Sequence, residues 1–218
     1  VCVSEEGAIA KKPSNVSFAE AAGMSDGGLT ALHFLRDNAE LQEGQKVLIN
    51  GASGSVGTFG VQFAKHFGAE VTGVCSTSNM DLVSSLGADK VVDYTRESFL
   101  DLNEKYDVVF DAVGKSSYSK CKRILNEGGI YLTTVPSLGI MFQMIRTSLF
   151  GKKKAVFAAT GLRKPKEKVK DLKFMNFLLE KGSIKSIIDK TYSMSEVALA
   201  HEYVERGHKV GNVVIQLN

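Results

Sequence analysis

A chain of 218 residues, of which 44% are hydrophobic, is long enough to bury a substantial core in one domain or slightly more. It contains no run of 18 apolar residues, so we expect no membrane span. Residues 151–218 hold 14 basic and 7 acidic residues, but no aromatic residues alternate with the lysine clusters, and we expect no nucleic-acid partner.

Strand and helix patterns alternate along the chain. We expect a short strand at 8–10, then a capping box formed by Ser17 and Glu20, and a helix over 28–38. Sheet strands are predicted at 46–50, 70–75, 90–93, 107–111 and 130–134, with helices between them at 56–67, 79–86, 97–102 and 117–125. The last elements are predicted to be helices at 167–181 and 195–205 and strands at 187–190 and 212–217.

This alternation predicts an α/β fold, a Rossmann-type doubly wound parallel sheet with helices on both faces. Continuous apolar stretches at 47–49, 108–110 and 130–132 are typical of strands buried on both faces. The segment 138–150 is apolar and rich in methionine, which leaves three interpretations open: a helix beside the active site, a dimer surface, or part of the core. Core or interface is favoured over a cofactor-binding segment.

The turn after the first sheet strand is the most informative segment, with the sequence Gly51-Ala52-Ser53-Gly54-Ser55-Val56-Gly57. An apolar strand precedes it and an amphipathic helix follows, which is typical of the loop that receives the pyrophosphate of a dinucleotide. We therefore predict that the cofactor is bound by Gly54, Ser55, Val56 and Gly57. Alanine replaces the first glycine of the usual G-x-G-x-x-G pattern, so the alternative is a turn whose glycines serve only helix–strand packing.

The residues after the second sheet strand bear on the choice between NAD and NADP. NAD-specific sites usually place Asp or Glu at this strand end, whereas this chain has Cys75 followed by Ser76, Thr77 and Ser78. Without an acid, a 2′-phosphate meets no repulsion, and the three hydroxyls can donate hydrogen bonds to it. NADP(H) is therefore favoured over NAD(H); the alternative is a plain Ser/Thr-rich helix start.

Several motifs extend this pattern over nearly the whole chain. They lie at 13–22, 28–32, 44–54, 86–89, 93–94, 109–114 and 128–129, and one of them reads Val109-Phe110-Asp111-Ala112-Val113-Gly114. Together they resemble the medium-chain dehydrogenase/reductase superfamily, and within it the zinc-independent quinone oxidoreductases of the zeta-crystallin type.

The resemblance implies a GroES-like catalytic domain and a Rossmann domain. Residues 1–15 would then be an edge of the catalytic domain, and 16–184 the Rossmann NAD(P)-binding domain. Residues 185–218 would be a C-terminal segment that returns toward the catalytic domain. Most of the GroES-like domain is missing from the sequence, so we expect a piece of a longer protein.

The resemblance also bears on metals. In the zinc-dependent branch of the superfamily, a cysteine ligand would lie near 21–24, where this chain has none. The cysteines of this chain also form no C-x-x-C pair. We expect no metal site; the alternative is a zinc-type alcohol dehydrogenase whose ligands lie in the missing region. Three widely spaced cysteines indicate a reducing compartment, and we expect a cytoplasmic protein.

The resemblance finally implies roles for further residues. Tyr94 would lie against the adenosine end of the cofactor. The residues expected near the nicotinamide half are Thr30, Val113, Gly114, Thr133 and Val135. Asn212 stands where relatives often carry lysine.

The implied reaction is hydride transfer from NADPH to a small-molecule quinone or an unsaturated carbonyl compound. No side chain stands out as catalytic. Relatives of this type pair through an edge strand of the Rossmann sheet, so a homodimer is expected. The alternative is a non-catalytic nucleotide-binding or dimerisation fragment.

Overall fold

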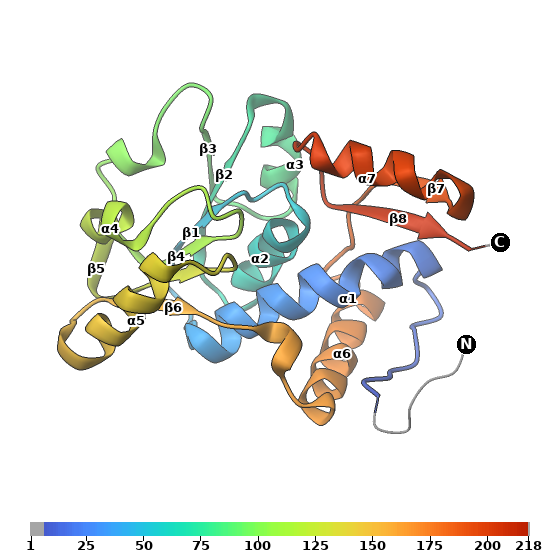
Figure 1. The fold of residues 1–218 in the computed structure, drawn as a ribbon, viewed down its shortest axis with the longest axis horizontal. Helices are drawn as coiled ribbons and strands as arrows, with labels where there is room; N and C mark the ends of the chain where they lie inside the picture. Colours follow the sequence, from blue (N-terminus) through green and yellow to red (C-terminus); the bar gives the residue numbers. More distant parts are fainter. Residues whose placement is uncertain (1–6, 218) are drawn as a thin grey trace.

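Six parallel strands form the central sheet, in the order β3-β2-β1-β4-β5-β6 (Figure 1). The computed structural model describes residues 7–217. The strands are β1 (Lys46–Asn50), β2 (Glu70–Cys75), β3 (Lys90–Asp93), β4 (Tyr106–Asp111), β5 (Leu125–Thr133) and β6 (Lys154–Phe157). The order reverses between β1 and β4, and doubly wound sheets bind their ligands at such a switch point.

Helices cover both faces of the sheet. One core cluster joins it to α1 (Phe18–Leu32), α2 (Ser55–His66), α3 (Met80–Ser85) and α6 (Pro165–Glu180). A second cluster joins the other face to α4 (Tyr118–Cys121) and α5 (Leu138–Phe150). Short 3₁₀ turns lie at Thr77–Asn79, Phe99–Asp101, Lys122–Ile124, Thr160–Leu162 and Met194–Glu196.

Alternate residues of the central strands supply these two clusters. Ile49 and Phe110 belong to the first, and Leu48 and Val109 belong to the second. All four are fully buried, because side chains alternate between the faces of a strand and both faces are covered here.

A separate two-stranded parallel sheet ends the chain. It consists of β7 (Ile188–Ser193) and β8 (Asn212–Gln216), joined by α7 (Val197–Glu205). Figure 1 shows this unit in red beside α1. The Gly211 N–H donates to the Ser53 carbonyl oxygen at 2.8 Å, and Gly54 and Gly211 form a parallel bridge. The C-terminal unit is therefore attached directly to the glycine turn.

The predicted fold class is confirmed, and the boundaries of β1, β2 and β3 match their predictions. The expected strand at 8–10 is wrong, because those residues have no regular structure. The helix expected over 28–38 begins ten residues earlier, at Phe18, and its last part, His33–Asn38, is a π-helix. The helix expected at 117–125 is only one turn, α4, followed by a 3₁₀ turn.

Two further differences concern the edge of the sheet. The lysines at 152–154 precede or begin β6, a sheet strand that the sequence pattern did not predict. The apolar segment 138–150 forms α5, but most of its large apolar side chains are exposed, so the core interpretation is wrong. None of the helices described for residues 7–217 is both long and apolar enough to cross a lipid bilayer.

The capping box of α1 provides a test of local stability. The Glu20 N–H donates to Ser17 Oγ at 3.2 Å, and the Ser17 N–H donates to Glu20 Oε2 at 2.8 Å. We expect Ser17→Ala to lower the free energy of unfolding by about 1 kcal/mol, because the Glu20 N–H loses its acceptor. Urea denaturation measures this. Ser25→Ala, in the same helix, is the control and should change stability by less than about 0.5 kcal/mol; an equal effect of both variants would contradict the role of the cap.

Candidate cofactor-binding site

Two of the three glycines in the turn after β1 are required by the protein's own packing. Gly51 has a φ of +82°, and a Cβ there would lie 2.4 Å from a methyl group of Val113. A Cβ on Gly57 would lie 2.0 Å from the Gly51 carbonyl oxygen, so α2 could not approach the end of β1. Packing therefore accounts for Gly51 and Gly57 without any ligand.

Gly54 is different. Its φ of −79° is open to any residue, and a Cβ would meet only the Gly51 carbonyl oxygen, at 3.5 Å. Gly54 is also the N-cap of α2 and offers no side chain to the N–H groups of the first turn, whereas α1, α4 and α5 begin with capping serines. A glycine with free space at an uncapped helix start fits the close approach of phosphate oxygens.

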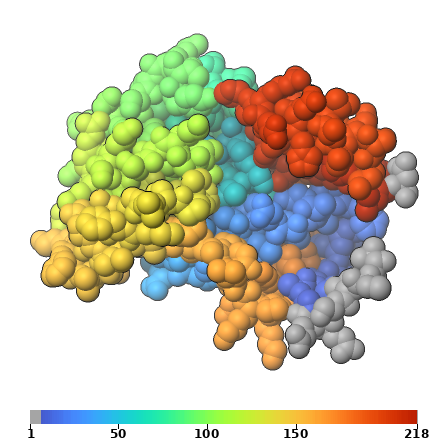
Figure 2. Space-filling view, in the orientation of Figure 1, coloured from blue at the N-terminus to red at the C-terminus, as the bar shows by residue number. Residues whose placement is uncertain are grey.

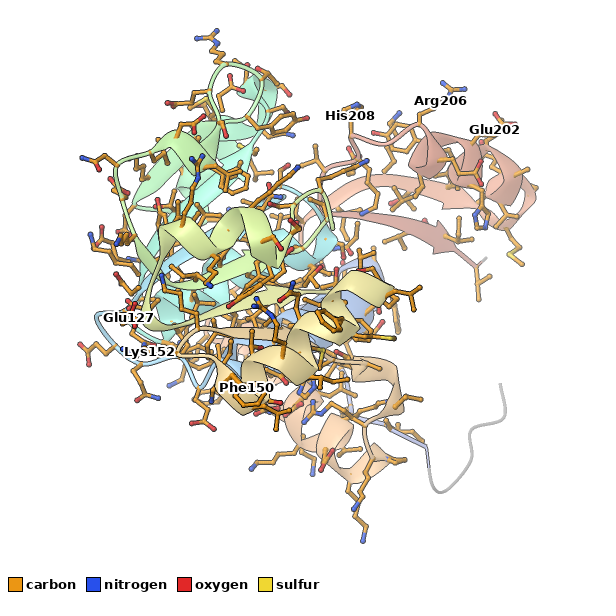
Figure 3. All side chains as sticks on the ribbon, turned by 60° about the vertical axis from the view of Figure 1, so that its left-hand side comes forward. Glu127, Phe150, Lys152, Glu202, Arg206 and His208 are labelled. Carbon is orange, nitrogen blue, oxygen red and sulfur yellow. The ribbon has the colours of Figure 1, made fainter. Side chains whose placement is uncertain are left out.

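A cavity of about 1020 Å³ opens beside Gly54. Its walls come from the ends of β1 and β2, the loops after β3 and β4, and the connection from α7 to β8. Of the residues predicted to bind the cofactor, it brings together Gly54, Ser76, Tyr94 and Val113. The connection from α7 to β8 contributes Arg206, His208 and Lys209 to the lining; Figure 3 labels the first two near the end of α7.

The residues after β2 form a small hydrogen-bonded group. Ser76 Oγ and Ser78 Oγ are 3.2 Å apart, and Asn79 Nδ2 donates to Ser76 Oγ and to Ser53 Oγ, each at 3.2 Å. Cys75 is buried, and burial together with the Asp93 charge raises the pKa of its thiol to about 11. Cys75 is therefore a neutral end to β2, and the hydroxyls that follow it reach the cavity through Ser76.

Thr77 differs from its neighbours, because its hydroxyl donates to the carboxylate of Asp93 at the end of β3. Thr95 donates to the same carboxylate from its N–H at 2.9 Å and from its hydroxyl at 2.7 Å. These hydrogen bonds, with the nearby Arg96 charge, lower the pKa of Asp93. The sequence pattern did not reveal this carboxylate, because the contact depends on the pairing of β2 with β3.

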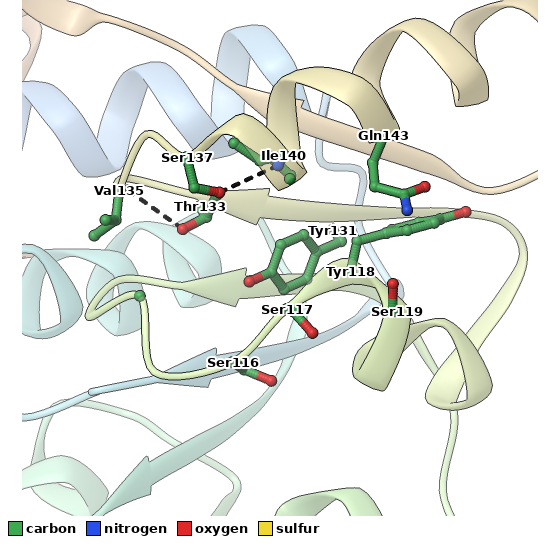
Figure 4. A pocket seen from close by; sticks show the side chains of 12 residues that line it. Ser116, Ser117, Tyr118, Ser119, Tyr131, Thr133, Val135, Ser137, Ile140 and Gln143 are labelled. Carbon is green, nitrogen blue, oxygen red and sulfur yellow. Dashed lines mark hydrogen bonds between the residues drawn. The ribbon is translucent and has the colours of Figure 1, made fainter.

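Three of the five residues expected at the nicotinamide half line a second, smaller cavity of about 180 Å³ (Figure 4). Gly114, Thr133 and Val135 line it, and Thr133 Oγ1 accepts the Val135 N–H at 3.3 Å. Gly114 has a φ of +66°, and a Cβ there would lie 2.5 Å from Val135. The loop after β4 thus separates this cavity from the larger one, which Val113 lines.

A buried carboxylate holds that loop in place. Asp111 accepts hydrogen bonds from Asn50 Nδ2 at 2.9 Å, the Ser116 N–H at 2.8 Å and the Tyr131 hydroxyl at 3.0 Å. Burial, reinforced by the Asp111 charge, raises the pKa of Tyr131, so its hydroxyl remains a donor. Asp111 is a positioning residue that the sequence analysis named only as part of a motif.

Some predicted residues line neither cavity. They are Thr30, Ser55, Val56, Gly57, Thr77 and Ser78. Thr30 is half-buried within α1. Ser55 Oγ donates to Asn212 Oδ1 at 2.5 Å, so its hydroxyl fastens β8 to α2, while its N–H remains at the uncapped helix start. Within residues 7–217, no three His, Cys, Asp or Glu side chains group together in a way that could hold a metal ion.

Comparisons with known proteins identify the family of this chain. The family model described as zinc-binding dehydrogenase matches residues 86–215, more than half of the chain. The chain is 38% identical over 218 residues to 2-methylene-furan-3-one reductase of Solanum lycopersicum, covering 97% of this chain and 50% of that protein. It is 35% identical to the chloroplastic NADPH-dependent alkenal/one oxidoreductase of Arabidopsis thaliana, with 97% and 50% coverage.

Both relatives are about twice as long as the part that this chain matches. Among solved structures, the quinone oxidoreductase from Coxiella burnetii superposes with a TM-score of 0.84 at 27% identity, over 96% of this chain and 64% of that one. The family match, the two relatives and the shared fold agree with one another. The chain therefore belongs to the zinc-binding dehydrogenase family of the medium-chain dehydrogenase/reductase superfamily.

Proposed function

We propose that this chain is the cofactor-binding part of an NADP(H)-dependent oxidoreductase of the quinone oxidoreductase type. The observation that carries the proposal is Gly54, the one turn glycine that internal packing does not require, at an uncapped helix start beside a cavity of about 1020 Å³. Two relatives are named for reductase or oxidoreductase activity, and a structural neighbour is named a quinone oxidoreductase.

NADP(H) is proposed over NAD(H) because the end of β2 offers hydroxyls and no acid to the cavity. The carboxylate that pairs with the end of β2, Asp93, is 4% exposed and accepts hydrogen bonds from Thr77 and Thr95, so its charge is partly compensated. One relative is also named as NADPH-dependent.

The arrangement divides the proposed binding roles among the strand ends. The backbone of Gly54, Ser55, Val56 and Gly57 receives the phosphates, and Ser76 with Ser78 receives the adenosine ribose. Tyr94, which is half exposed in the same cavity, lies against the adenine. The residues proposed for the nicotinamide half are Thr30, Val113, Gly114, Thr133 and Val135.

The bound cofactor would supply the hydride, and this chain's residues would bind and orient it. The acceptor would be a small quinone or a compound with an activated C=C or carbonyl group. No side chain of this chain is assigned a catalytic role. The proposal includes zinc independence and a cytoplasmic location, supported by the cysteine spacing; one relative is named as chloroplastic.

We keep the domain boundaries at 1–15, 16–184 and 185–218, with residues 1–6 outside the described part of the chain. The separate sheet of β7 and β8 supports the last boundary. We also propose a homodimer. β6 is an edge strand, and an exposed edge offers its backbone groups for pairing.

The neighbouring helix α5 adds an apolar surface to that edge; Figure 2 shows it in yellow on the visible face. The exposed large apolar side chains on it are Leu138, Met141, Phe142, Ile145, Leu149 and Phe150. A contiguous apolar patch of this kind marks an interaction surface.

Gly54 and Gly57 form a matched pair that separates ligand binding from packing. We expect Gly54→Ala to fold with little loss of stability, but to weaken NADPH binding about tenfold or more, because the added methyl group occupies the space for the phosphates. Gly57→Ala should instead lower the melting temperature strongly, since its Cβ has no room beside Gly51. Calorimetric titration and thermal denaturation measure the two effects. Unchanged NADPH affinity in Gly54→Ala would contradict the proposed phosphate site.

The dimer is tested by sedimentation equilibrium. We expect the wild-type chain to be dimeric and Ile145→Glu to shift it toward the monomer, because a charge would be buried in the interface. The Ile145 side chain is 64% exposed in the single chain, so circular dichroism should not change. Phe18→Glu is the control, because Phe18 is equally apolar and 84% exposed at the start of α1, away from α5 (Figure 1). A wild-type chain that stays monomeric at high concentration would contradict the proposed dimer.

A further inference from the structure

A basic side chain lines the large cavity near Ser76 without belonging to the predicted site. It is Arg96, in the turn that follows β3. Position 78 is serine in this chain, and the residues that follow β2, Ser76 to Asn79, include no basic side chain. The end of β2 therefore offers no cation to a phosphate, whereas Arg96, from the turn after the neighbouring strand β3, lines the same cavity as Ser76.

The pairing of β2 with β3 brings Arg96 to this place. Cys75 pairs with Asp93, and the Tyr94 N–H donates to the Cys75 carbonyl oxygen at 3.0 Å. The two segments that follow the strands also touch, because Thr77 Oγ1 and Thr95 Oγ1 are 3.2 Å apart. Ser76 and Arg96 each adjoin one of these threonines in the chain, and both line the cavity.

The charge of Arg96 is available to a ligand. Its side chain is 75% exposed, and its one ion pair within residues 7–217 is a loose contact of 3.4 Å from Nε to Asp93 Oδ2. That contact leaves the two terminal nitrogens of the guanidinium without a protein partner in the described part of the chain. By contrast, Arg123 holds Asp101 through a terminal nitrogen at 2.6 Å.

Asp93 orients Arg96 without neutralising the cavity. The carboxylate already accepts hydrogen bonds from Thr77 and Thr95, and it is buried behind them. The charged side chains that line the cavity are four basic and two acidic, namely Arg96, Lys115, Arg206, Lys209, Glu97 and Glu205. This excess of positive charge suits a polyanionic ligand.

We propose that Arg96 is the specificity-determining residue for NADP(H), because its guanidinium binds the 2′-phosphate together with the hydroxyl of Ser76, which Ser78 Oγ contacts at 3.2 Å. This inference rests on the proposed function. A guanidinium presents paired N–H donors that match the oxygens of a phosphate, and neutral hydroxyls complete the shell without adding charge. The selectivity for NADP(H) over NAD(H) thus comes from the turn after β3, although the sequence pattern predicts it at the end of β2.

The test compares NADPH with NADH, which lacks the 2′-phosphate, by calorimetric titration of the 218-residue chain. Arg96→Gln removes the charge and keeps a polar side chain of similar reach. Arg206→Gln is the matched comparison, since Arg206 is 77% exposed and lines the same cavity from the connection between α7 and β8. Circular dichroism of each variant confirms that the fold is intact.

We expect Arg96→Gln to raise the Kd for NADPH about tenfold or more and to leave the Kd for NADH unchanged, whereas Arg206→Gln keeps the ratio of the two affinities. An unchanged NADPH affinity in Arg96→Gln, an equal loss for both cofactors, or a selective loss in Arg206→Gln would each overturn the assignment. If the wild-type chain binds NADPH but the variants give one of these three contradicting results, only the assignment of Arg96 fails and the proposed function stands. If the wild-type chain binds neither cofactor, the proposed function fails and Arg96 loses its assignment with it.

Discussion

In the turn between β1 and α2, the helix lies so close to the strand that a methyl group on Gly57 would be 2.0 Å from the Gly51 carbonyl oxygen. This close approach sets the position of the first turn of α2, whose backbone N–H groups have no capping side chain. It also sets the place of Val113, which packs against Gly51. The C-terminal sheet is attached to the same turn through Gly54 and Gly211. The large cavity exists because these segments meet around one turn.

Charge is distributed around that cavity across two strand ends. β2 ends in a buried thiol that stays neutral, and the acidic residue that a NAD site would place there is found one strand further along, as Asp93. Thr77 and Thr95 donate hydrogen bonds to that carboxylate, so it supports the neighbouring turn and does not line the cavity. In the proposed site, the preference for NADP(H) is therefore a property of the β2–β3 pair, and neither strand end alone decides it.

The sequence predicts β1, β2 and β3 well, whereas it misses the first part of β5 and the whole of β6. β1 holds a continuous apolar run, at 47–49, just before the glycine turn, so its boundaries are read directly. β6 is a short edge strand of which only Ala155 is buried, and the lysines around its start leave no apolar pattern that would predict a strand. Local patterns place Ser76 and Tyr94 at strand ends, and both reach the cavity. They cannot show that Thr77 turns to Asp93 or that Arg96 lies near Ser76, because both depend on the register between β2 and β3.

The central claim is that the glycine turn and the ends of β2 and β3 form an NADP(H) site. The most direct measurement is a calorimetric titration of the wild-type chain with NADPH and, side by side, with NADH. We expect one NADPH to bind per chain, with a lower Kd than for NADH. Binding of neither cofactor, or tighter binding of NADH, would contradict it.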